Sequence, residues 1–378
     1  MEAIKTAVIG VGMMGYSQIR NCLEPLTDYD ITAVCEVYEP NIRRIADYFE
    51  GKGKAVPVYR DYRELLEKED FSLAVIVTPD YLHEEIAAAC LRAGKHIRLE
   101  KPMATTMEGL KNVLEACREH PECIVQIGYE LRYADVIVKM KNSLPQIGSP
   151  KMIWCHEFRH PFLKKEGLIP DWIRKKAYSG GTLLEKNCHH FDLFNMIADA
   201  KPLRVYATGD NSVEYRDTDV LDHAFVTVDY ENGMRANLSL CMFSPELKGQ
   251  KHMHALEIGV MGDQGRLEIR DDDLYVWDRE AKREEHYTYL RDNFEAHSED
   301  ILPSLRELAR CIREKRQPLT DVSTGLKSAL LALAAETSAQ EQRIVTIQEM
   351  EERYGISYDG KPDGRKYKVE DHERGEIV

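Results

Sequence analysis

The chain has 378 residues, of which 43% are hydrophobic and 31% charged, a composition typical of a globular protein with more than one domain. Its formal net charge of −14 argues against a nucleic-acid partner, because a DNA-binding protein needs a basic face to displace counterions. No apolar run approaches the ~20 residues of a membrane-spanning helix, which argues against a membrane protein.

Up to about Gln126, short apolar runs alternate with amphipathic helical stretches. The expected strands are Thr6–Ile9, Asp30–Cys35, Ala74–Val77, Ile97–Leu99 and Ile124–Ile127. The expected helices between them are Met14–Cys22, Pro40–Phe49, Tyr62–Glu67, Leu82–Ala93 and Met107–Glu119. Strands that are apolar on both faces and separated by helices predict an α/β domain with a doubly wound parallel sheet, here over residues 1–128.

After about Tyr129 the apolar runs become longer and more nearly alternating. The expected strands are Lys151–Phe158, Leu203–Gly209, Ala224–Tyr230, Met234–Met242, His254–Met261 and Arg266–Arg270. Asn232-Gly233 between two of them predicts a tight hairpin, because this pair tolerates positive φ at both central positions. One long helix, Thr182–Ala198, is expected to interrupt the strands. These features predict a second α/β domain over residues 129–350, with a large, mainly antiparallel open sheet.

Two further helices are expected late in the chain, over Ile301–Glu314 and Thr324–Gln342. The second is rich in alanine and leucine and is expected to pack against a domain, with the first domain as one candidate. Residues 351–378 are charged and are expected to form a polar tail or an arm on a neighbouring subunit.

The nine cysteines are scattered and never spaced as Cys-x-x-Cys, which favours reduced thiols over a disulfide framework or a zinc site. No other group of residues indicates a metal site. The first expected strand begins almost at Met1, which leaves no room for a cleavable leader. We therefore expect a cytoplasmic protein that uses no metal ion.

The sequence Gly10-Val11-Gly12-Met13-Met14-Gly15 directly follows the first expected strand and opens a helix. In such a turn the first glycine permits the tight bend, the second lets backbone approach a pyrophosphate, and the third lets the helix pack close to the strand. Glu36 ends the next strand, where a ribose-binding carboxylate belongs. The pattern predicts a bound NAD; NADP is less favoured because Glu36 would repel a 2′-phosphate, although Arg43 and Arg44 could reach one.

A second motif, Glu100-Lys101-Pro102, follows the strand-like stretch that ends at Leu99. It places a lysine where the reactive end of a dinucleotide is expected. Together the two motifs indicate an enzyme that transfers a hydride.

The chain resembles the Gfo/Idh/MocA family, which includes glucose–fructose oxidoreductase, inositol dehydrogenase and rhizopine-catabolism proteins. The resemblance extends from Thr6 to about Ile347. The residues that carry it are the glycine motif, Thr78-Pro79-Asp80 with His83, Glu100-Lys101-Pro102, Gly128-Tyr129 with Arg132-Tyr133, and Ser179-Gly180-Gly181 leading into Glu185 and His189.

This resemblance implies an N-terminal Rossmann domain, a C-terminal α/β domain whose open sheet often forms oligomer interfaces, and a nicotinamide-dependent reaction at a ring hydroxyl of a sugar, glycoside or cyclic polyol. Lys101 matches the family's active-site lysine, His189 its catalytic histidine, and Glu185 the usual aspartate. The residues implied to line the cofactor are Thr78, Pro79, Glu100 and Lys101. The residues assigned to the substrate are Tyr129, Arg132, Trp172, Lys186 and His190.

The spacing of Glu185 and His189 supports a proton relay, because residues four apart on one helix share a face, and Asp192 continues that face. A carboxylate beside an imidazole stabilises the imidazolium, so His189 is a suitable base for the hydroxyl proton. Lys101, partly desolvated near an oxidised nicotinamide, is expected to have a lowered pKa and to stabilise developing alkoxide charge.

Several assignments have two interpretations. Lys186 and His190 are either solvated or reach the substrate pocket. Trp172 and Arg174 either wall the substrate site or pack within their loop. His83 is expected to cap or anchor its helix. Departures from the family pattern at Glu185, Lys186 and Asp80 affect the predicted substrate more than the predicted reaction.

The leading hypothesis is an NAD-dependent dehydrogenase of a small carbohydrate or polyol. One alternative is an NAD-dependent glycoside hydrolase that uses transient oxidation and elimination, with Lys186, His190 or Tyr178 as the extra acid–base group. Another is a non-catalytic dinucleotide-binding sensor, which has no need for Lys101, Glu185 and His189 together. Because helices can cover only one face of the second sheet, a homodimer or homotetramer is expected.

Overall fold

The computed structural model describes residues 2–159, 171–245, 254–270, 273–280, 283–288 and 298–359. The expected tail over 351–378 lies outside the described residues from residue 360 onward. None of the described helices is both long and apolar enough to cross a membrane.

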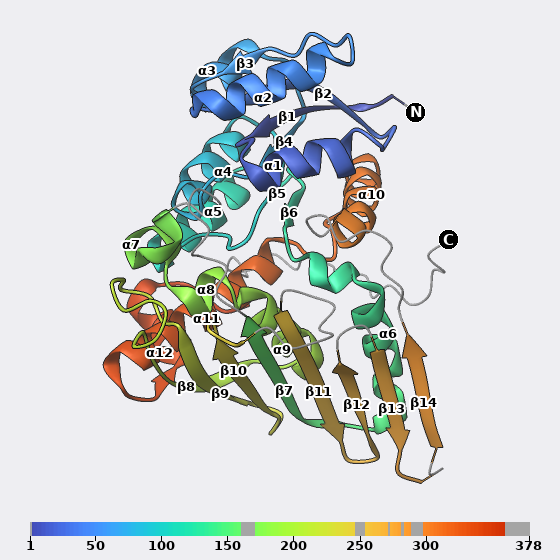
Figure 1. Ribbon diagram of the computed structural model, residues 1–378, viewed down its shortest axis with the longest axis vertical. Helices are drawn as coiled ribbons and strands as arrows, with labels where there is room; N and C mark the ends of the chain where they lie inside the picture. Colours follow the sequence, from blue (N-terminus) through green and yellow to red (C-terminus); the bar gives the residue numbers. More distant parts are fainter. Residues whose placement is uncertain are drawn as a thin grey trace.

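The N-terminal domain is built on a six-stranded sheet in the order β3-β2-β1-β4-β5-β6, in which every neighbouring pair is parallel (Figure 1). The strands are β1 (Ile4–Ile9), β2 (Tyr29–Cys35), β3 (Val58–Tyr59), β4 (Leu73–Ile76), β5 (His96–Leu99) and β6 (Val125–Ile127). The helices are α1 (Met13–Gln18, continued by a π-helical turn over Ile19–Leu23), α2 (Glu39–Glu50), α3 (Tyr62–Lys68), α4 (His83–Arg92) and α5 (Met107–Glu119). The central strands are buried on both faces, so the predicted doubly wound sheet is confirmed.

The second sheet has nine strands in the order β14-β13-β12-β11-β7-β10-β9-β8-β15. Its strands are β7 (Pro150–Arg159), β8 (Pro202–Asp210), β9 (His223–Tyr230), β10 (Arg235–Cys241), β11 (His254–Gly262), β12 (Gly265–Arg270), β13 (Asp273–Asp278), β14 (Arg283–Thr288) and β15 (Val345–Thr346). Only β7 and β10 pair in parallel, so the predicted, mainly antiparallel sheet is confirmed. The predicted hairpin joins β9 to β10, with Gly233 at φ +86°.

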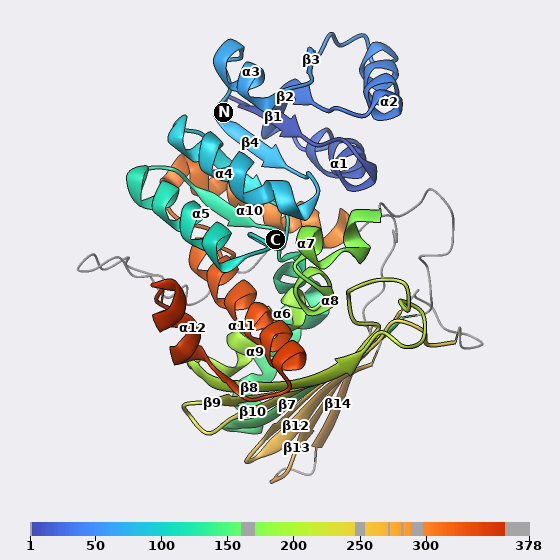
Figure 2. The same cartoon turned by 90° about the vertical axis from the view of Figure 1, so that its left-hand side faces the viewer.

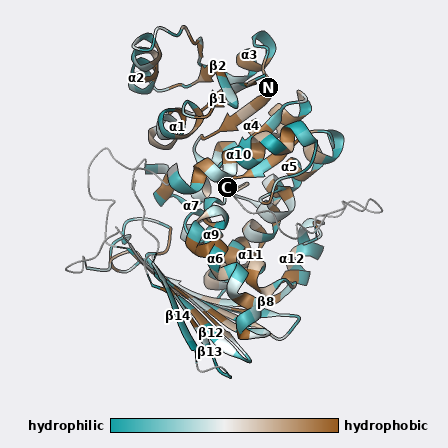
Figure 3. Cartoon of the chain, turned by 90° about the vertical axis from the view of Figure 1, so that its right-hand side faces the viewer, coloured by the Kyte–Doolittle hydropathy of each residue, from teal (hydrophilic) through white to brown (hydrophobic). Residues whose placement is uncertain are grey.

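The helices of the second half of the chain lie between the two sheets or at their ends. They are α6 (Asp135–Ser143), α7 (Lys176–Ser179), α8 (Thr182–Glu185), α9 (Cys188–Ala198), α10 (Ser298–Glu314), α11 (Val322–Glu341) and α12 (Ile347–Tyr354). Figure 2 shows α6, α9 and α11 on the face of the large sheet that is turned toward the N-terminal domain, and none of the described helices lies on the opposite face. In Figure 3 the same sheet is seen with its edge strands β12–β14 at the lower end of the molecule.

Two late helices connect the halves of the molecule. The apolar side of α10 belongs to the core of the N-terminal domain, where Leu305 and Leu308 are buried with Val8 and Ile19. Helix α11 packs on α9 and β8 but also contacts α5 and β6. Gly325 permits this approach, because a Cβ there would lie 2.8 Å from the side chain of Ile127. The two domains are therefore held against one another by α11.

One predicted element is wrong in detail. The single helix expected over Thr182–Ala198 is two helices, α8 and α9, separated by Lys186 and Asn187. The carbonyl oxygen of Glu185, which would accept from the amide of His189 in a continuous helix, accepts instead from Nζ of Lys101 at 2.7 Å. A tertiary contact thus ends the first helix.

Candidate active site

The residues predicted to hold a dinucleotide follow the carboxyl ends of the parallel strands, which meet at one edge of the sheet. Gly10 has φ +90°, and a Cβ there would lie 2.4 Å from the carbonyl oxygen of Val77. A Cβ on Gly15 would lie 2.1 Å from the carbonyl oxygen of Gly10. Gly12 instead faces open space, with no atom within 4 Å of a built Cβ. The turn therefore needs Gly10 and Gly15 for its own packing and leaves Gly12 open toward a ligand.

The turn runs into α1, where Met13 is exposed and Met14 is half-buried. The first amides of a helix have no partner within it, so this end suits the pyrophosphate of a dinucleotide. On the neighbouring loop, the hydroxyl of Thr78 is buried and has no hydrogen-bond partner among the described residues. These features fit the bound dinucleotide that the glycine motif predicts.

Glu36 lies at the end of β2, as expected, and its carboxylate is held by four donors. One oxygen accepts from the amide of Val11 at 3.0 Å and from the side chain of Asn41 at 3.2 Å. The other accepts from the amides of Val37 and Tyr38 at 2.8 and 2.9 Å. Glu36 thus ties the glycine turn to the second strand, in addition to any contact with a ribose.

The two arginines that could bind an extra phosphate differ in their surroundings. Arg44 donates to the carbonyl oxygens of Val11 and Gly12 at 2.7 and 3.0 Å, beneath the glycine turn. Arg43 is exposed and pairs with Glu39 at 3.5 Å.

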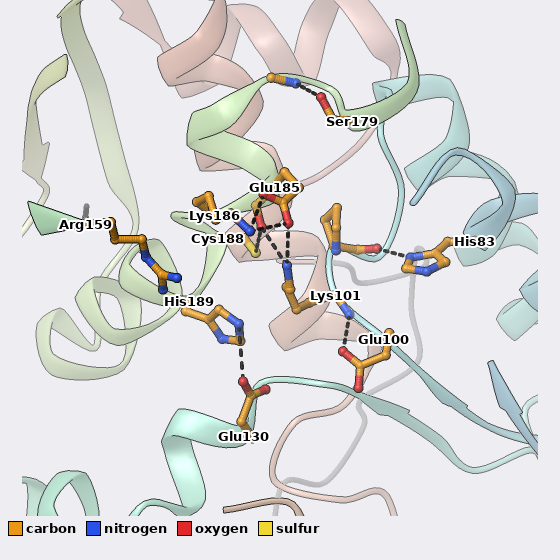
Figure 4. Close-up of polar contacts among 12 residues, drawn as sticks. His83, Glu100, Lys101, Glu130, Arg159, Ser179, Glu185, Lys186, Cys188 and His189 are labelled. Carbon is orange, nitrogen blue, oxygen red and sulfur yellow. Dashed lines mark hydrogen bonds and ion pairs between the residues drawn. The ribbon is translucent and has the colours of Figure 1, made fainter. Parts of the chain in front are cut away.

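His83 joins the two loops that carry the remaining cofactor residues. Its Nδ1 lies 2.7 Å from the carbonyl oxygen of Pro102 and its Nε2 lies 2.9 Å from that of Thr78 (Figure 4). Burial lowers the pKa of this imidazole. His83 does more than anchor its own helix, because it fixes the loop that ends in Pro79 relative to the loop of Glu100 and Lys101.

Glu100 and Lys101 follow β5, and their side chains point in different directions, that of Lys101 toward Glu185 of the second domain (Figure 4). Glu100 accepts from the side chain of Gln18 at 2.6 Å. Nζ of Lys101 lies 2.7 Å from the carbonyl oxygen of Glu185 and 3.2 Å from its Oε1. The half-buried lysine of the first domain and the buried glutamate of the second therefore form one ion pair.

Lys186 adds a second ammonium to this pair, with Nζ 3.0 Å from both carboxylate oxygens of Glu185. Burial alone would raise the pKa of Glu185, but the two ammonium groups outweigh it and hold this pKa at about 2. Burial lowers the pKa of Lys186. The side chain of Lys186 is 17% exposed, so it lies against Glu185 and is largely withdrawn from solvent.

The expected lowering of the Lys101 pKa is not found among the chain's own groups. Burial acts in that direction, but Glu185 foremost, with Asp80 and Glu100, raises the pKa well above its ordinary value. The sequence expectation counted desolvation and the oxidised nicotinamide, whereas the carboxylates that surround the lysine act in the opposite direction.

His189 does not contact Glu185 as the helical spacing predicted. Because the helix breaks at Lys186 and Asn187, the two side chains point to different partners (Figure 4). Nε2 of His189 lies 3.6 Å from Oε1 of Glu130, a buried residue that the sequence analysis did not select. Burial raises the pKa of the Glu130 carboxyl to about 8.

The remaining four predicted substrate residues each lie against a different partner. Tyr129 is 1% exposed, and its ring meets that of His189 edge-on at 5.6 Å, so it supports the histidine and does not face a ligand. Arg132 forms two hydrogen bonds of 2.7 Å with Asp192, which joins the loop after β6 to α9. Asp192 therefore pairs with Arg132 and does not extend the face of Glu185.

His190 is buried and faces the large sheet, with Nε2 3.2 Å from Glu157 on β7. It is therefore neither solvated nor at the ion pair of Lys101. Trp172 lies in a short 3₁₀ segment, Asp171–Arg174, and meets Tyr81 edge-on at 6.4 Å, while Tyr81 also packs on Tyr178 at 4.8 Å.

A small hollow with room for about one water molecule adjoins the ion pair on the side of the second domain. It is lined by Ile173, Arg174, Thr182, Glu185, Lys186, Tyr215 and Val220. Arg174 therefore walls this pocket, which was one of its two interpretations. The pocket places Glu185 and Lys186 between a cavity and the lysine that follows β5.

Sequence reasoning missed Glu130 and assigned no role to Asp80. Asp80 is buried, and burial raises the pKa of its carboxyl well above its ordinary value. Both residues follow the carboxyl end of a parallel strand, where ligand-binding residues of such sheets gather, and this position could have identified them.

Residues 4–129 match a family model described as an oxidoreductase family with an NAD-binding Rossmann fold. Residues 144–347 match the C-terminal alpha/beta domain of the same oxidoreductase family. The myo-inositol 2-dehydrogenase of Thermotoga maritima is 24% identical over 92% of this chain and 99% of that protein. The inositol 2-dehydrogenase of Salmonella typhimurium is 25% identical over 70% of this chain and 74% of that protein.

Solved structures have the same fold. The myo-inositol 2-dehydrogenase of Lactobacillus plantarum has a TM-score of 0.78 at 20% identity, over 92% of this chain and 100% of that chain. The WlbA dehydrogenase of Bordetella pertussis, in complex with NADH and UDP-GlcNAcA, has a TM-score of 0.75 at 18% identity, over 91% of this chain and 98% of that chain.

Proposed function

Because the chain belongs to the Gfo/Idh/MocA oxidoreductase family and is a dehydrogenase with a nicotinamide-dinucleotide domain, we propose that it oxidises a ring hydroxyl of a cyclic polyol or sugar with NAD. The reverse reduction uses the same groups. Relatives named as inositol 2-dehydrogenases support the polyol class.

The residues proposed to hold the dinucleotide are Gly10, Gly12, Met13, Met14, Gly15, Glu36, Thr78, Pro79, Glu100 and Lys101. NAD is favoured over NADP because the carboxylate of Glu36 ends β2, and because Arg44 is already bound to the glycine turn. Val37 and Tyr38, which follow Glu36, are 71% and 62% exposed and offer no positive charge to a 2′-phosphate. When bound, NAD supplies the acceptor for the hydride.

The observation that carries the proposal is the buried ion pair of Lys101 and Glu185, next to His189, at the edge of the sheet where the glycine turn lies. In the oxidation, the hydroxyl proton passes to His189. The hydrogen of the carbinol C–H bond leaves with the bonding electron pair as a hydride, and a carbonyl forms. Lys101, kept cationic by Glu185, donates a hydrogen bond to the substrate oxygen and stabilises its developing negative charge. Lys186 is proposed to contact another substrate hydroxyl from the adjoining pocket.

The test is a panel of inositols, sugars and aryl glycosides incubated with NAD, with reduced nicotinamide followed by absorbance. Net formation of NADH with at least one inositol or sugar is expected. Release of sugar from a glycoside without net NADH would instead indicate the NAD-dependent glycoside hydrolase. Binding of NAD with no turnover of any class would favour the sensor.

A further inference from the structure

Glu130 lies at the end of β6 and enters the site from below, opposite Lys101 (Figure 4). Its side chain is 11% exposed, and its Oε1 is 3.6 Å from Nε2 of His189. It stands in the 3₁₀ segment Glu130–Tyr133, which follows directly on Gly128 and Tyr129. A carboxyl group at this depth needs a partner that uses its charge or its proton.

The ring of His189 is oriented so that Nε2 lies on the side of Glu130. Its Nδ1 is buried, and the ring is held edge-on by Tyr129 at 5.6 Å and an interplanar angle of 80°. Nε2 therefore faces both Glu130 and the space beside Lys101. Glu185, which the helical spacing suggested as partner, is bound to Lys101 and Lys186.

We propose that Glu130 is the positioning residue of His189: its carboxyl holds the imidazole ring in place and sets the charge beside it, and thereby controls removal of the substrate's hydroxyl proton. This inference rests on the proposed dehydrogenase function. Glu130 acts through His189 and touches neither the reacting carbon nor the hydride. Glu185 pairs with Lys101 instead, so the site contains two separate pairs, Glu130 with His189 and Glu185 with Lys101.

The groups that face Glu130 explain how it works. Burial raises the pKa of its carboxyl first; Glu100 from the end of β5 and Asp300 from α10 raise it further, and Lys101 lowers it. With the resulting pKa of about 8, Glu130 is mostly protonated at neutral pH and becomes an anion in mild alkali. An anion beside Nε2 favours the imidazolium form of His189, because opposite charges at this distance stabilise each other.

Oxidation should therefore accelerate as the pH rises through the titration of Glu130. In Glu130→Gln the neutral amide keeps the shape of the protonated acid but cannot ionise. This variant should retain the slower, low-pH behaviour at every pH.

The first experiment follows the protonation of the Glu130–His189 pair in the absence of substrate. The protein is labelled with ¹³C at the Cε1 of histidine, and the His189 resonance is assigned by its loss in His189→Asn. In the unmodified protein this resonance should move in two steps, one of them near pH 8. Glu130→Gln should abolish the step near pH 8, whereas the matched control Glu185→Gln should retain it. A step near pH 8 that persists in Glu130→Gln would overturn the proposal.

The second experiment measures kcat/KM against pH, with myo-inositol and NAD as the probe pair. The unmodified protein should show an increase through pH 8 that Glu130→Gln lacks, with a roughly tenfold deficit in alkali. An identical increase in both proteins would also overturn the proposal. If no polyol is oxidised, the proposed function fails, and the histidine resonance alone decides the role of Glu130. Glu130→Ala serves as the second variant should Glu130→Gln not fold.

Discussion

Replacing Glu130 by glutamine should stabilise the protein, and only in neutral and alkaline solution. The pKa of the Glu130 carboxyl is raised from 4.5 to about 8 in the folded chain. Below pH 4.5 the carboxyl is protonated in both the folded and the unfolded chain, so it contributes no difference. Between pH 4.5 and 8 the unfolded chain loses this proton and the folded chain keeps it, so the free energy of unfolding falls as the pH rises.

The size of this effect follows from the shift. At about 1.4 kcal/mol for each pKa unit, the unfavourable contribution of Glu130 grows to about 5 kcal/mol above pH 8. Glutamine stays neutral, so Glu130→Gln escapes this loss. For a chain of this size the difference corresponds to a melting temperature higher by roughly 6 °C in alkali.

Circular dichroism melting curves at pH 5 and pH 9 would measure this difference. We expect Glu130→Gln to melt within about 2 °C of the unmodified protein at pH 5 and clearly above it at pH 9. Glu115→Gln makes the same chemical change on the exposed face of α5 and should change neither temperature. If the difference between Glu130→Gln and the unmodified protein were the same at both pH values, the buried, raised carboxyl would be refuted.

Three further predictions concern the proposed function and the assembly. Lys101→Ala and His189→Ala should each fold, as judged by circular dichroism, and bind NADH, as judged by nicotinamide fluorescence. Each variant should lose at least ~100-fold in kcat, and near-normal turnover by both would contradict the assigned site. Calorimetric titration should give tighter binding of NAD than of NADP, with a smaller gap in Glu36→Ala, and equal binding by the unmodified protein would contradict the role of its carboxylate. Phe225 is 61% exposed in β9, on the sheet face that none of the described helices covers. Light scattering should therefore give a dimer or tetramer, and Phe225→Asp should weaken this assembly. A mass near 43.5 kDa at micromolar concentration would exclude it.

The features that the sequence determined by itself are those with local causes. The glycine turn was predictable because Gly10 and Gly15 have no room for a Cβ. The tight packing of the turn therefore requires glycine at both positions, and this is visible in the sequence. The two sheets were predictable because their apolar patterns differ, continuous in β4 and alternating in β9. Helix α10 was predicted as an element, but its place in the core of the N-terminal domain depends on contacts with residues almost 300 positions earlier.

The partners within the site were decided only by tertiary structure. The spacing of Glu185 and His189 predicts a shared helical face, and this holds only for a helix that continues through Lys186 and Asn187. Lys101, from the other domain, takes the carbonyl oxygen and the carboxylate of Glu185, so the helix ends there and His189 turns toward Glu130. Residue spacing describes neighbours along one element, whereas the partner of a buried charge is chosen among all groups that the folded chain brings within a few ångströms.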